Sequence, residues 1–271
     1  MDTSEIIIFD NILGSDLRKE LREVVLGIKT SRKNQWNDIA LGPDPSRWER
    51  GGLDDVLVED NEEESDGGAC WGLRGEAVED ICLNKHVPIQ KFECLLAKMF
   101  PDYNVCKLPE AVFGPAVSSI TANAATSVDT FHWHIDADPA LVPPSPWADC
   151  YGRFPNRTRG KPRFISCLLY INETWDVEAF GGGTKFLDPP TGKELTIDPI
   201  PGRILMMDQD ITHTVIAPSN CAGKSPRYSL VWKLILHPKK PHQDMQLFAY
   251  DDSRISYFGN AKDYSNQKII F

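Results

Sequence analysis

The chain has 271 residues, 41% of them hydrophobic, so it can bury a sizeable core, and we expect one β-rich domain with helical support rather than two domains. A formal net charge of −10 and a pI of about 5.1 argue against a nucleic-acid-binding protein, and no apolar run is long enough to predict a membrane span. Seven cysteines without paired spacing, and an acidic N-terminus without a signal sequence, predict reduced thiols and a cytoplasmic or nuclear location.

Residues 1–114 are expected to form a support of helices and strands. The run at residues 6–9 predicts a strand. Ser15 predicts the start of a helix, because the following apolar residues fall on one helical stripe, namely Leu17, Leu21, Val24, Val25 and Ile28. Residues 54–66 carry eight acids and no Lys or Arg, which predicts a solvated loop. A second helix is expected from Pro88 to Met99, with an inward side made of Ile89, Phe92, Leu96 and Met99.

A His-x-Asp pair follows a predicted strand at residues 118–124. His134 has an aspartate two residues later, Asp136, whereas His132 offers a second register that lacks this aspartate. A further histidine, His213, lies about eighty residues on, in a β-prone stretch. Two imidazoles and one carboxylate that leave coordination positions open form the ligand set of non-haem Fe(II) sites. The sequence therefore predicts a metal site at these three residues.

Residues 139–163 are predicted to be a long loop without secondary structure, rooted beside the His-x-Asp pair. Its second half holds no acid and five cations, namely Arg153, Arg157, Arg159, Lys161 and Arg163. Loops of this length are usually functional or disordered. We interpret the loop as a lid over the metal, whose charge favours an anionic substrate; an ordinary surface loop is the alternative.

Two strands and a glycine-rich turn are predicted after this loop. Residues 163–172 read as a strand, a polar connection leads to Gly181-Gly-Gly183, and a second strand starts at Thr184, which together is the pattern of an antiparallel hairpin. Residues 201–208 read as a turn that feeds a further short apolar strand before His213.

Residues 227–232 predict another strand, in which side chains alternate between two faces. Arg227 and Ser229 share one face, and the other face carries Tyr228, Leu230 and Trp232. An arginine that points into a small barrel beside a hydroxyl can grip a carboxylate through a charge-assisted contact.

The order of these motifs resembles a known family. His-x-Asp at 134–136, Tyr170-Ile-Asn172, Trp175-Asp176, Gly-Gly-x-Thr-x-Phe at 181–186, then His213 and Arg227, are similar to the catalytic domain of Fe(II)- and 2-oxoglutarate-dependent oxygenases, in their prolyl 4-hydroxylase-like branch. The resemblance implies a mainly β fold with supporting helices (α+β). Its double-stranded β-helix (jelly-roll) core would span residues 115–238, followed by a C-terminal extension at 239–271.

The resemblance also implies roles for five residues. His134, Asp136 and His213 would be the catalytic iron ligands, Arg227 would bind the distal carboxylate of 2-oxoglutarate, and Tyr170 would add a phenol hydrogen bond to that carboxylate. The implied cofactors are Fe(II), 2-oxoglutarate and O₂, with ascorbate as an optional addition.

The implied reaction oxidises an unactivated C–H bond by hydroxylation, ring closure or desaturation, with release of succinate and CO₂. The substrate would be a small anionic amino-acid-like metabolite or a prolyl-containing peptide, with neither nucleic acid nor membrane as a partner. The strand at residues 118–124 lacks the Tyr often found there in prolyl hydroxylases, which leaves the substrate open. A catalytically silent jelly-roll binding module is the alternative; such relatives usually lose a ligand or the anchoring cation, and this chain keeps all four.

Overall fold

The computed structural model describes residues 6–27, 42–52, 69–83, 86–114, 117–239 and 258, and shows a mainly β protein with supporting helices. The strands are β1 (Ile6–Phe9), β2 (Trp48–Gly52), β3 (Ala69–Leu73), β4 (Tyr103–Lys107), β5 (Ile120–Ala125), β6 (Arg163–Tyr170), β7 (Thr184–Asp188), β8 (Lys193–Ile197), β9 (Ile204–Asp208), β10 (His213–Val215) and β11 (Arg227–Pro238). The helices are α1 (Ser15–Leu26), α2 (Gly75–Leu83), α3 (Val87–Met99), α4 (Glu110–Phe113), α5 (Pro146–Tyr151) and α6 (Val177–Phe180), with short 3₁₀ turns η2 (Pro139–Leu141) and η3 (Asn220–Ala222).

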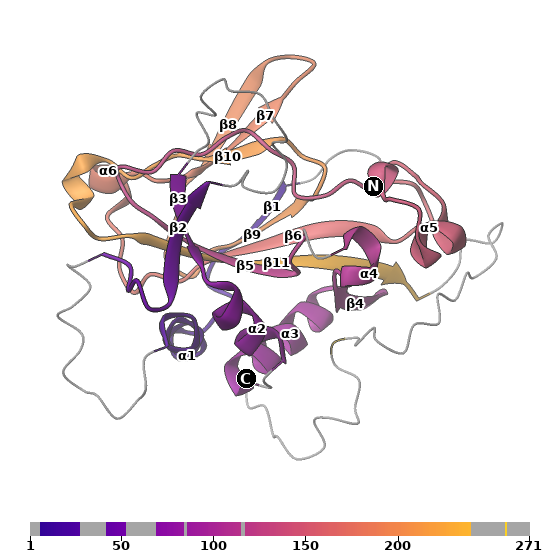
Figure 1. The fold of residues 1–271 in the computed structure, drawn as a ribbon, viewed down its shortest axis with the longest axis horizontal. Coiled ribbons are helices and arrows are strands. Elements are labelled where there is room, and N and C mark those ends of the chain that lie inside the picture. Colours follow the sequence, from indigo (N-terminus) through magenta and orange to yellow (C-terminus); the bar gives the residue numbers. More distant parts are fainter. Residues whose placement is uncertain are drawn as a thin grey trace.

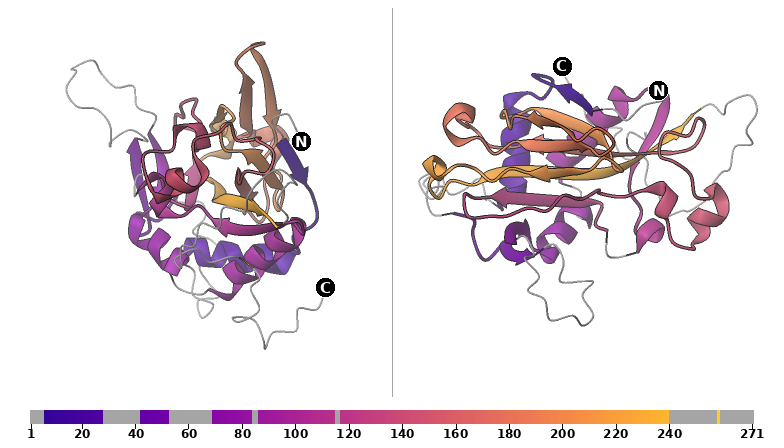
Figure 2. Two further views of the ribbon diagram at one scale, coloured as in Figure 1. Left: turned by 90° about the vertical axis from the view of Figure 1, so that its right-hand side faces the viewer. Right: turned by 90° about the horizontal axis from the view of Figure 1, so that it is seen from above.

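The strands form two antiparallel sheets. The larger sheet has the order β1-β9-β6-β11-β5-β3-β2, with β4 pairing with the far end of β11, and the smaller sheet has the order β10-β7-β8. In Figure 1 and in the left view of Figure 2, helices α1–α3 lie on one side of the larger sheet and the smaller sheet lies on the other. This is the double-stranded β-helix expected from the sequence, and the predicted fold class is confirmed.

Strand β11 is the central strand of the larger sheet. Its twelve residues pair with β6 along one side, and with β5 and then β4 along the other. The predicted alternation is observed. Tyr228, Leu230 and Trp232 belong to the core under the helices, whereas Val231 belongs to a separate core cluster between the sheets. The face that carries Arg227 and Ser229 therefore points into the space between the sheets.

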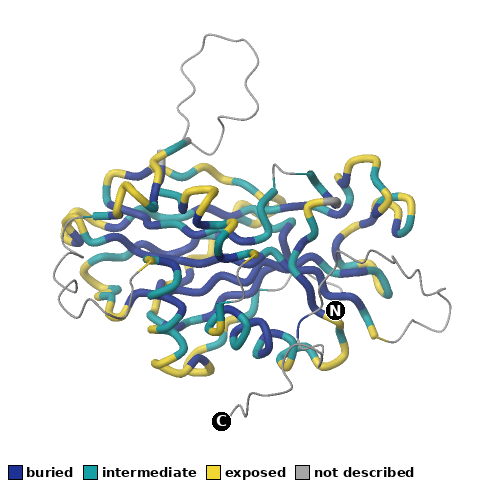
Figure 3. The backbone as a smooth tube through the Cα atoms, turned by 60° about the horizontal axis from the view of Figure 1, so that its bottom comes forward, coloured by how far each residue is buried: buried dark blue, intermediate teal, exposed yellow. Residues whose placement is uncertain are grey.

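The helices cover the larger sheet with apolar side chains. The predicted stripe of α1 is confirmed at Leu21 and Val25, which are fully buried. In α3, Phe92 packs against Trp232 of β11 with ring centroids 4.6 Å apart, and Leu96 is also fully buried. Figure 3 shows this buried band running through the strands and the sheet-facing sides of the helices. None of the helices in the described part of the chain is long and apolar enough to cross a bilayer.

Two predictions about local structure are wrong. Strands β6 and β7 do not form a hairpin, because β6 is enclosed by β11 and β9 and the chain after it crosses, through α6, to the other sheet. There β7 pairs with β8 around a turn that ends at Gly192, whose φ of 66° favours glycine. The segment 139–163 is also not a structureless loop, since it contains η2 and α5.

Three predictions concern residues outside the described part of the chain. They are the solvated acidic loop at 54–66, the place of Ile28 on the stripe of α1, and nearly all of the C-terminal extension at 239–271. Within that extension Phe258 is described; it is buried, and its backbone N–H donates to the carbonyl of Val105 in β4 at 2.8 Å.

Replacing Phe92 with alanine should destabilise the fold by about 3–5 kcal/mol, because the change leaves a cavity against Trp232 that the rigid sheet cannot close. Urea denaturation would measure the loss. Leu83→Ala at an exposed position of α2 is the matched control and should change the free energy of unfolding by less than about 0.5 kcal/mol. Equal losses in the two variants would contradict the packing described here.

Candidate active site

The structure brings His134, Asp136 and His213 together. His134 and His213 form an isolated antiparallel bridge, in which each backbone N–H donates to the other residue's carbonyl, at 3.0 and 2.9 Å. Opposed residues of such a pair place their side chains on the same face, and the two imidazole centroids lie 4.3 Å apart. One nitrogen or oxygen atom from each of the three side chains lies within 4.8 Å of the others. The three donor atoms can therefore share one metal ion.

Each imidazole is oriented by a contact between its Nδ1 and the backbone carbonyl two residues earlier. His134 Nδ1 lies 3.0 Å from the carbonyl oxygen of His132, and His213 Nδ1 lies 2.9 Å from that of Ile211. A carbonyl can only accept, so each Nδ1 carries the proton and each Nε2 is left as a lone-pair donor, which is the tautomer a metal requires. His132 thus takes part through its main chain; among the described residues, its ring is not in the cluster of metal-binding groups. Phe186 of β7 packs beside His213, with ring centroids 6.0 Å apart.

Two residues that the sequence analysis missed hold the carboxylate of Asp136. The hydroxyl of Ser166 donates to Asp136 Oδ2, and Lys233 Nζ lies 3.5 Å from Oδ1. Ser166 and Lys233 are opposed in the register of β6 and β11, so the two strands fix their contact with Asp136 together. Lys233 lies six residues after Arg227 and therefore shares its face of the strand. A second cation at this even spacing in an apolar strand could have predicted that Lys233 faces the site.

The electrostatic environment favours an ionised Asp136 carboxylate and a neutral His213 imidazole. Burial raises the pKa of Asp136. Lys233, then His213 and the Ser166 hydrogen bond, together lower it by more, so the pKa of Asp136 lies below its ordinary value. For His213, burial lowers the pKa and outweighs the attraction of Asp136, so its imidazole is neutral at physiological pH. These are the protonation states in which Asp136 and His213 can donate to a metal.

Arg227 lies at the other end of the same strand face. It is fully buried, Nη1 donates to the carbonyl of Gly182 at 2.9 Å, and Nη2 donates to Ser229 Oγ at 3.4 Å. In the described part of the chain no carboxylate pairs with this guanidinium, and Nε has no hydrogen-bond partner. Burial lowers the pKa of Arg227. A buried cation without a counter-ion is costly, so this arrangement points to an anionic ligand.

Tyr170 completes the surroundings of Arg227. Its ring centroid lies 5.4 Å from the guanidinium carbon, and its hydroxyl shares a 2.8 Å hydrogen bond with Thr184 Oγ1. Burial raises the pKa of Tyr170, so the phenol keeps its proton. Glycine is favoured at both turn positions, because Gly182 has a φ of 82° and a Cβ on Gly183 would lie 2.8 Å from the backbone oxygen of Ile197.

The basic segment 139–163 directs most of its cations into the protein, which corrects the prediction of an open, charged loop. Arg157 and Arg163 pair with the buried Asp208, while Arg153 Nε and Lys161 Nζ each donate to a backbone carbonyl, at 2.7 Å. Arg159 is exposed. The segment packs around its own apolar cluster, which includes Val142, Trp147, Tyr151 and Phe154. The charge that suggested an anionic substrate is therefore largely used within the fold.

Comparison with known proteins finds a family match over the part of the chain that contains these residues. The family model described as the 2OG-Fe(II) oxygenase superfamily matches residues 121–232. These residues belong to the 2OG-Fe(II) oxygenase superfamily. The matched span runs from β5 to β11 and includes the triad, Tyr170 and Arg227. The family that this region matches comprises oxygenases that use Fe(II), 2-oxoglutarate and O₂.

Solved structures of low sequence identity match over most of this chain. A prolyl hydroxylase from Trichoplax adhaerens, in complex with a hypoxia inducible factor peptide fragment, is 16% identical over 86% of this chain and 83% of its own, with a TM-score of 0.44. A Pseudomonas putida prolyl-4-hydroxylase is 14% identical over 88% and 95%, with a TM-score of 0.42. The carbocyclase SnoK from nogalamycin biosynthesis is 8% identical over 86% and 80%, with a TM-score of 0.45. Among curated proteins, no match to the oxygenase chain is found.

Replacing Asp136 with alanine should weaken the binding of Fe(II) or Co(II) at least about tenfold and abolish succinate formation, because two neutral imidazoles remain next to an uncompensated Lys233. Equilibrium dialysis would measure the metal and a succinate assay the turnover. Asp149→Ala, at an exposed position of α5, is the control and should match the wild type. Substantial succinate formation by the Asp136 variant would mean that this carboxylate is not a ligand.

Proposed function

We propose that this oxygenase holds Fe(II) through Nε2 of His134, Nε2 of His213 and a carboxylate oxygen of Asp136, and holds 2-oxoglutarate through Arg227. One observation carries the proposal: three metal donors converge at one end of a barrel face while a buried, unpaired guanidinium stands at the other. Two imidazoles and one carboxylate are the donor set that Fe(II) takes in such enzymes. The residues present therefore fit the metal that the family uses.

When bound, Fe(II) would offer open coordination positions to the 2-oxo acid and O₂ and supply the redox chemistry that oxidises a C–H bond as 2-oxoglutarate becomes succinate and CO₂. The surrounding residues prepare the ligands. The carbonyls of His132 and Ile211 fix the imidazole tautomers, and Ser166 and Lys233 hold the carboxylate in one orientation. Orientation of this kind lowers the reorganisation that the reaction requires.

The cosubstrate would lie between the metal and Arg227. Arg227 and Lys233 are six residues apart on one strand, or about 20 Å between Cα atoms, and both long side chains reach into the space between them. Arg227 supplies the charge for the distal carboxylate, with Nε and its remaining N–H groups as donors. Tyr170 and Thr184 carry two hydroxyl hydrogens and use one between them, so the other can be donated to the same carboxylate.

A cavity of about 530 Å³ lies where β3 meets β5 and reaches both the face that carries Arg227 and the side covered by α2, and we propose it as the route for the main substrate. It is lined by residues of β2, β3, α2 and β5, among them Gly51, Gly72, Thr121 and Asn123. Thr121 and Asn123 are opposed to Val231 and Ser229 in the sheet register, so they share the face that carries Arg227. Since no Lys or Arg lines the cavity, its charge does not favour an anionic substrate.

The proposed reaction is oxidation of an unactivated C–H bond in a prolyl-containing peptide or an amino-acid-like metabolite. The first test is anaerobic addition of Fe(II) and 2-oxoglutarate, which should produce the visible charge-transfer band of an Fe(II)-chelated 2-oxo acid. Succinate release is then measured in air with proline-containing peptides and free amino acids. Absence of both the band and any succinate would refute the proposal, whereas a band without stimulation by either class would refute the substrate assignment alone.

Arg227→Lys should raise the KM for 2-oxoglutarate by about tenfold to a hundredfold and leave metal affinity unchanged, because lysine keeps the charge but loses the planar fork. Steady-state succinate assays and metal dialysis measure the two effects. Arg159→Lys, at an exposed position, serves as the control. An unchanged KM in the Arg227 variant would remove this residue from the cosubstrate site.

Gly72→Val should raise the KM of whichever peptide or metabolite stimulates succinate formation by about tenfold or more, and should spare substrate-independent decarboxylation of 2-oxoglutarate. A Cβ at Gly72 meets no atom within 4 Å, so the first carbon of the new side chain fits without displacing the protein, and Gly72 lines the cavity. Gly14→Val, equally unobstructed but outside the cavity, is the control. If both variants keep the wild-type KM, the substrate enters elsewhere.

A further inference from the structure

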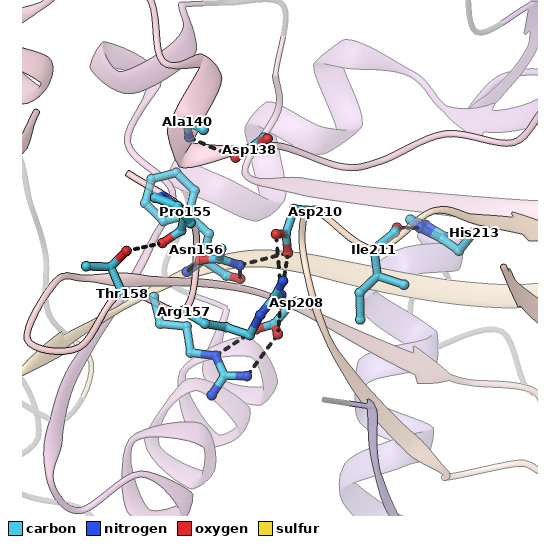
Figure 4. A network of polar contacts seen from close by, with 12 residues as sticks. Asp138, Ala140, Pro155, Asn156, Arg157, Thr158, Asp208, Asp210, Ile211 and His213 are labelled. Carbon is cyan, nitrogen blue, oxygen red and sulfur yellow. Dashed lines mark hydrogen bonds and ion pairs between the residues drawn. The ribbon is translucent and has the colours of Figure 1, made fainter. Parts of the chain in front are cut away.

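A network of ion pairs joins the basic segment to the turn that precedes His213 (Figure 4). Asp208 is fully buried, and Arg163 binds both of its oxygens, at 2.6 and 2.9 Å. Arg157 Nη1 lies 3.1 Å from Asp208 and 3.2 Å from Asp210, so one guanidinium bridges two acids. The amide of Asn156 also donates to Asp210, at 3.2 Å. Two cations and two anions balance each other in this network.

The two acids bound by Arg157 flank Gln209, which is directly connected to the metal site. The backbone N–H groups of Asp136 and Ala137 both donate to the carbonyl of Gln209, at 2.9 and 3.2 Å. The side chain of Gln209 is itself fixed, because Nε2 donates to carbonyls of β6 and β11 at 2.9 and 3.1 Å. Any displacement of this turn would therefore move the backbone that carries Asp136.

The same turn also sets the position of His213. The N–H of Ile211 donates to the carbonyl of Asp208 at 3.2 Å, and the carbonyl of Ile211 accepts from His213 Nδ1 at 2.9 Å. Figure 4 shows Asp208, Asp210, Ile211 and His213 following one another along this turn. Two of the three candidate ligands are thus hydrogen-bonded, directly or through the adjacent residue, to the turn that carries the Asp208 and Asp210 carboxylates.

We infer that Arg157 is a positioning residue for the metal centre: by bridging Asp208 and Asp210 it fixes the turn that holds Asp136 and His213 in register. This inference rests on the proposed function, since it assumes that these two residues bind the metal. It gives the basic segment a role different from that of a substrate lid, because the segment fastens the ligand-bearing turn from outside the barrel. Loss of an outer contact of this kind typically lowers metal affinity by about tenfold or more.

Arg157→Gln and Arg159→Gln form a matched pair for the test, because both remove one positive charge from the same segment and only Arg157 contacts the turn. Co(II) titration of the metal-free proteins, followed by its visible d–d absorption, should show about tenfold weaker binding for Arg157→Gln and no change for Arg159→Gln. Arg157→Lys, which keeps the charge, should recover part of the affinity. Amide exchange at Asp136 and Ala137 should accelerate in metal-free Arg157→Gln.

Thermal unfolding of each metal-free variant separates positioning from general stability. Wild-type Co(II) affinity in Arg157→Gln, whether or not its Tm falls, would overturn the inference. If that variant does not fold, Asp210→Asn replaces it, because this change keeps the Arg157–Asp208 pair. Asp210→Asn should also weaken Co(II) binding. Unchanged Co(II) affinity in Asp210→Asn would overturn the inference. If Arg157→Gln and Asp210→Asn both fold, the double variant that carries both changes should bind Co(II) no more weakly than Arg157→Gln alone. Failure of the wild type to bind Co(II) would instead refute the proposed metal site.

Discussion

The alternation of side chains along β11 is the constraint on which both the fold and the site depend. Tyr228, Leu230 and Trp232 bury their rings and methyl groups beneath the helices, while Arg227 and Lys233 reach into the space between the sheets. A register shift of one residue would exchange the two sets, placing buried aromatics in the reaction space and cations in the core. Pairing with β6 on one side, and with β5 and β4 on the other, excludes that shift. The hydrophobic core and the chemistry are therefore specified by the same strand.

Charge balance distinguishes the functional groups of this protein from those that serve the scaffold. Around Asp208 every buried charge has a partner, and the network is complete without any ligand. Asp136 has one cation beside it and two imidazoles within reach, a combination that can accept further positive charge. Arg227 is buried without an anion in the described part of the chain. Buried charges are costly when unpaired, so the two incomplete sites are where ligands belong.

The sequence predicted features that depend on local order or on strand alternation. The triad, the opposed faces of β11, and helices α1 and α3 could all be inferred from spacing. What it could not predict depends on which distant segments meet. The contacts of Ser166 and Lys233 with Asp136 follow from the pairing of β6 with β11, and the false hairpin arose because neighbours in sequence went to different sheets. Arg157 looked free because its acids lie about fifty residues away.

The pairing of His134 with His213 has a consequence for the order in which this protein assembles. The two residues are about eighty positions apart, and closing such a loop costs chain entropy that only the finished sheets can offset. The metal site therefore forms only when the fold has brought these two distant segments together. Metal bound there selects the native state over every other conformation, so iron supply would bear on the lifetime of the folded protein as well as on its catalysis.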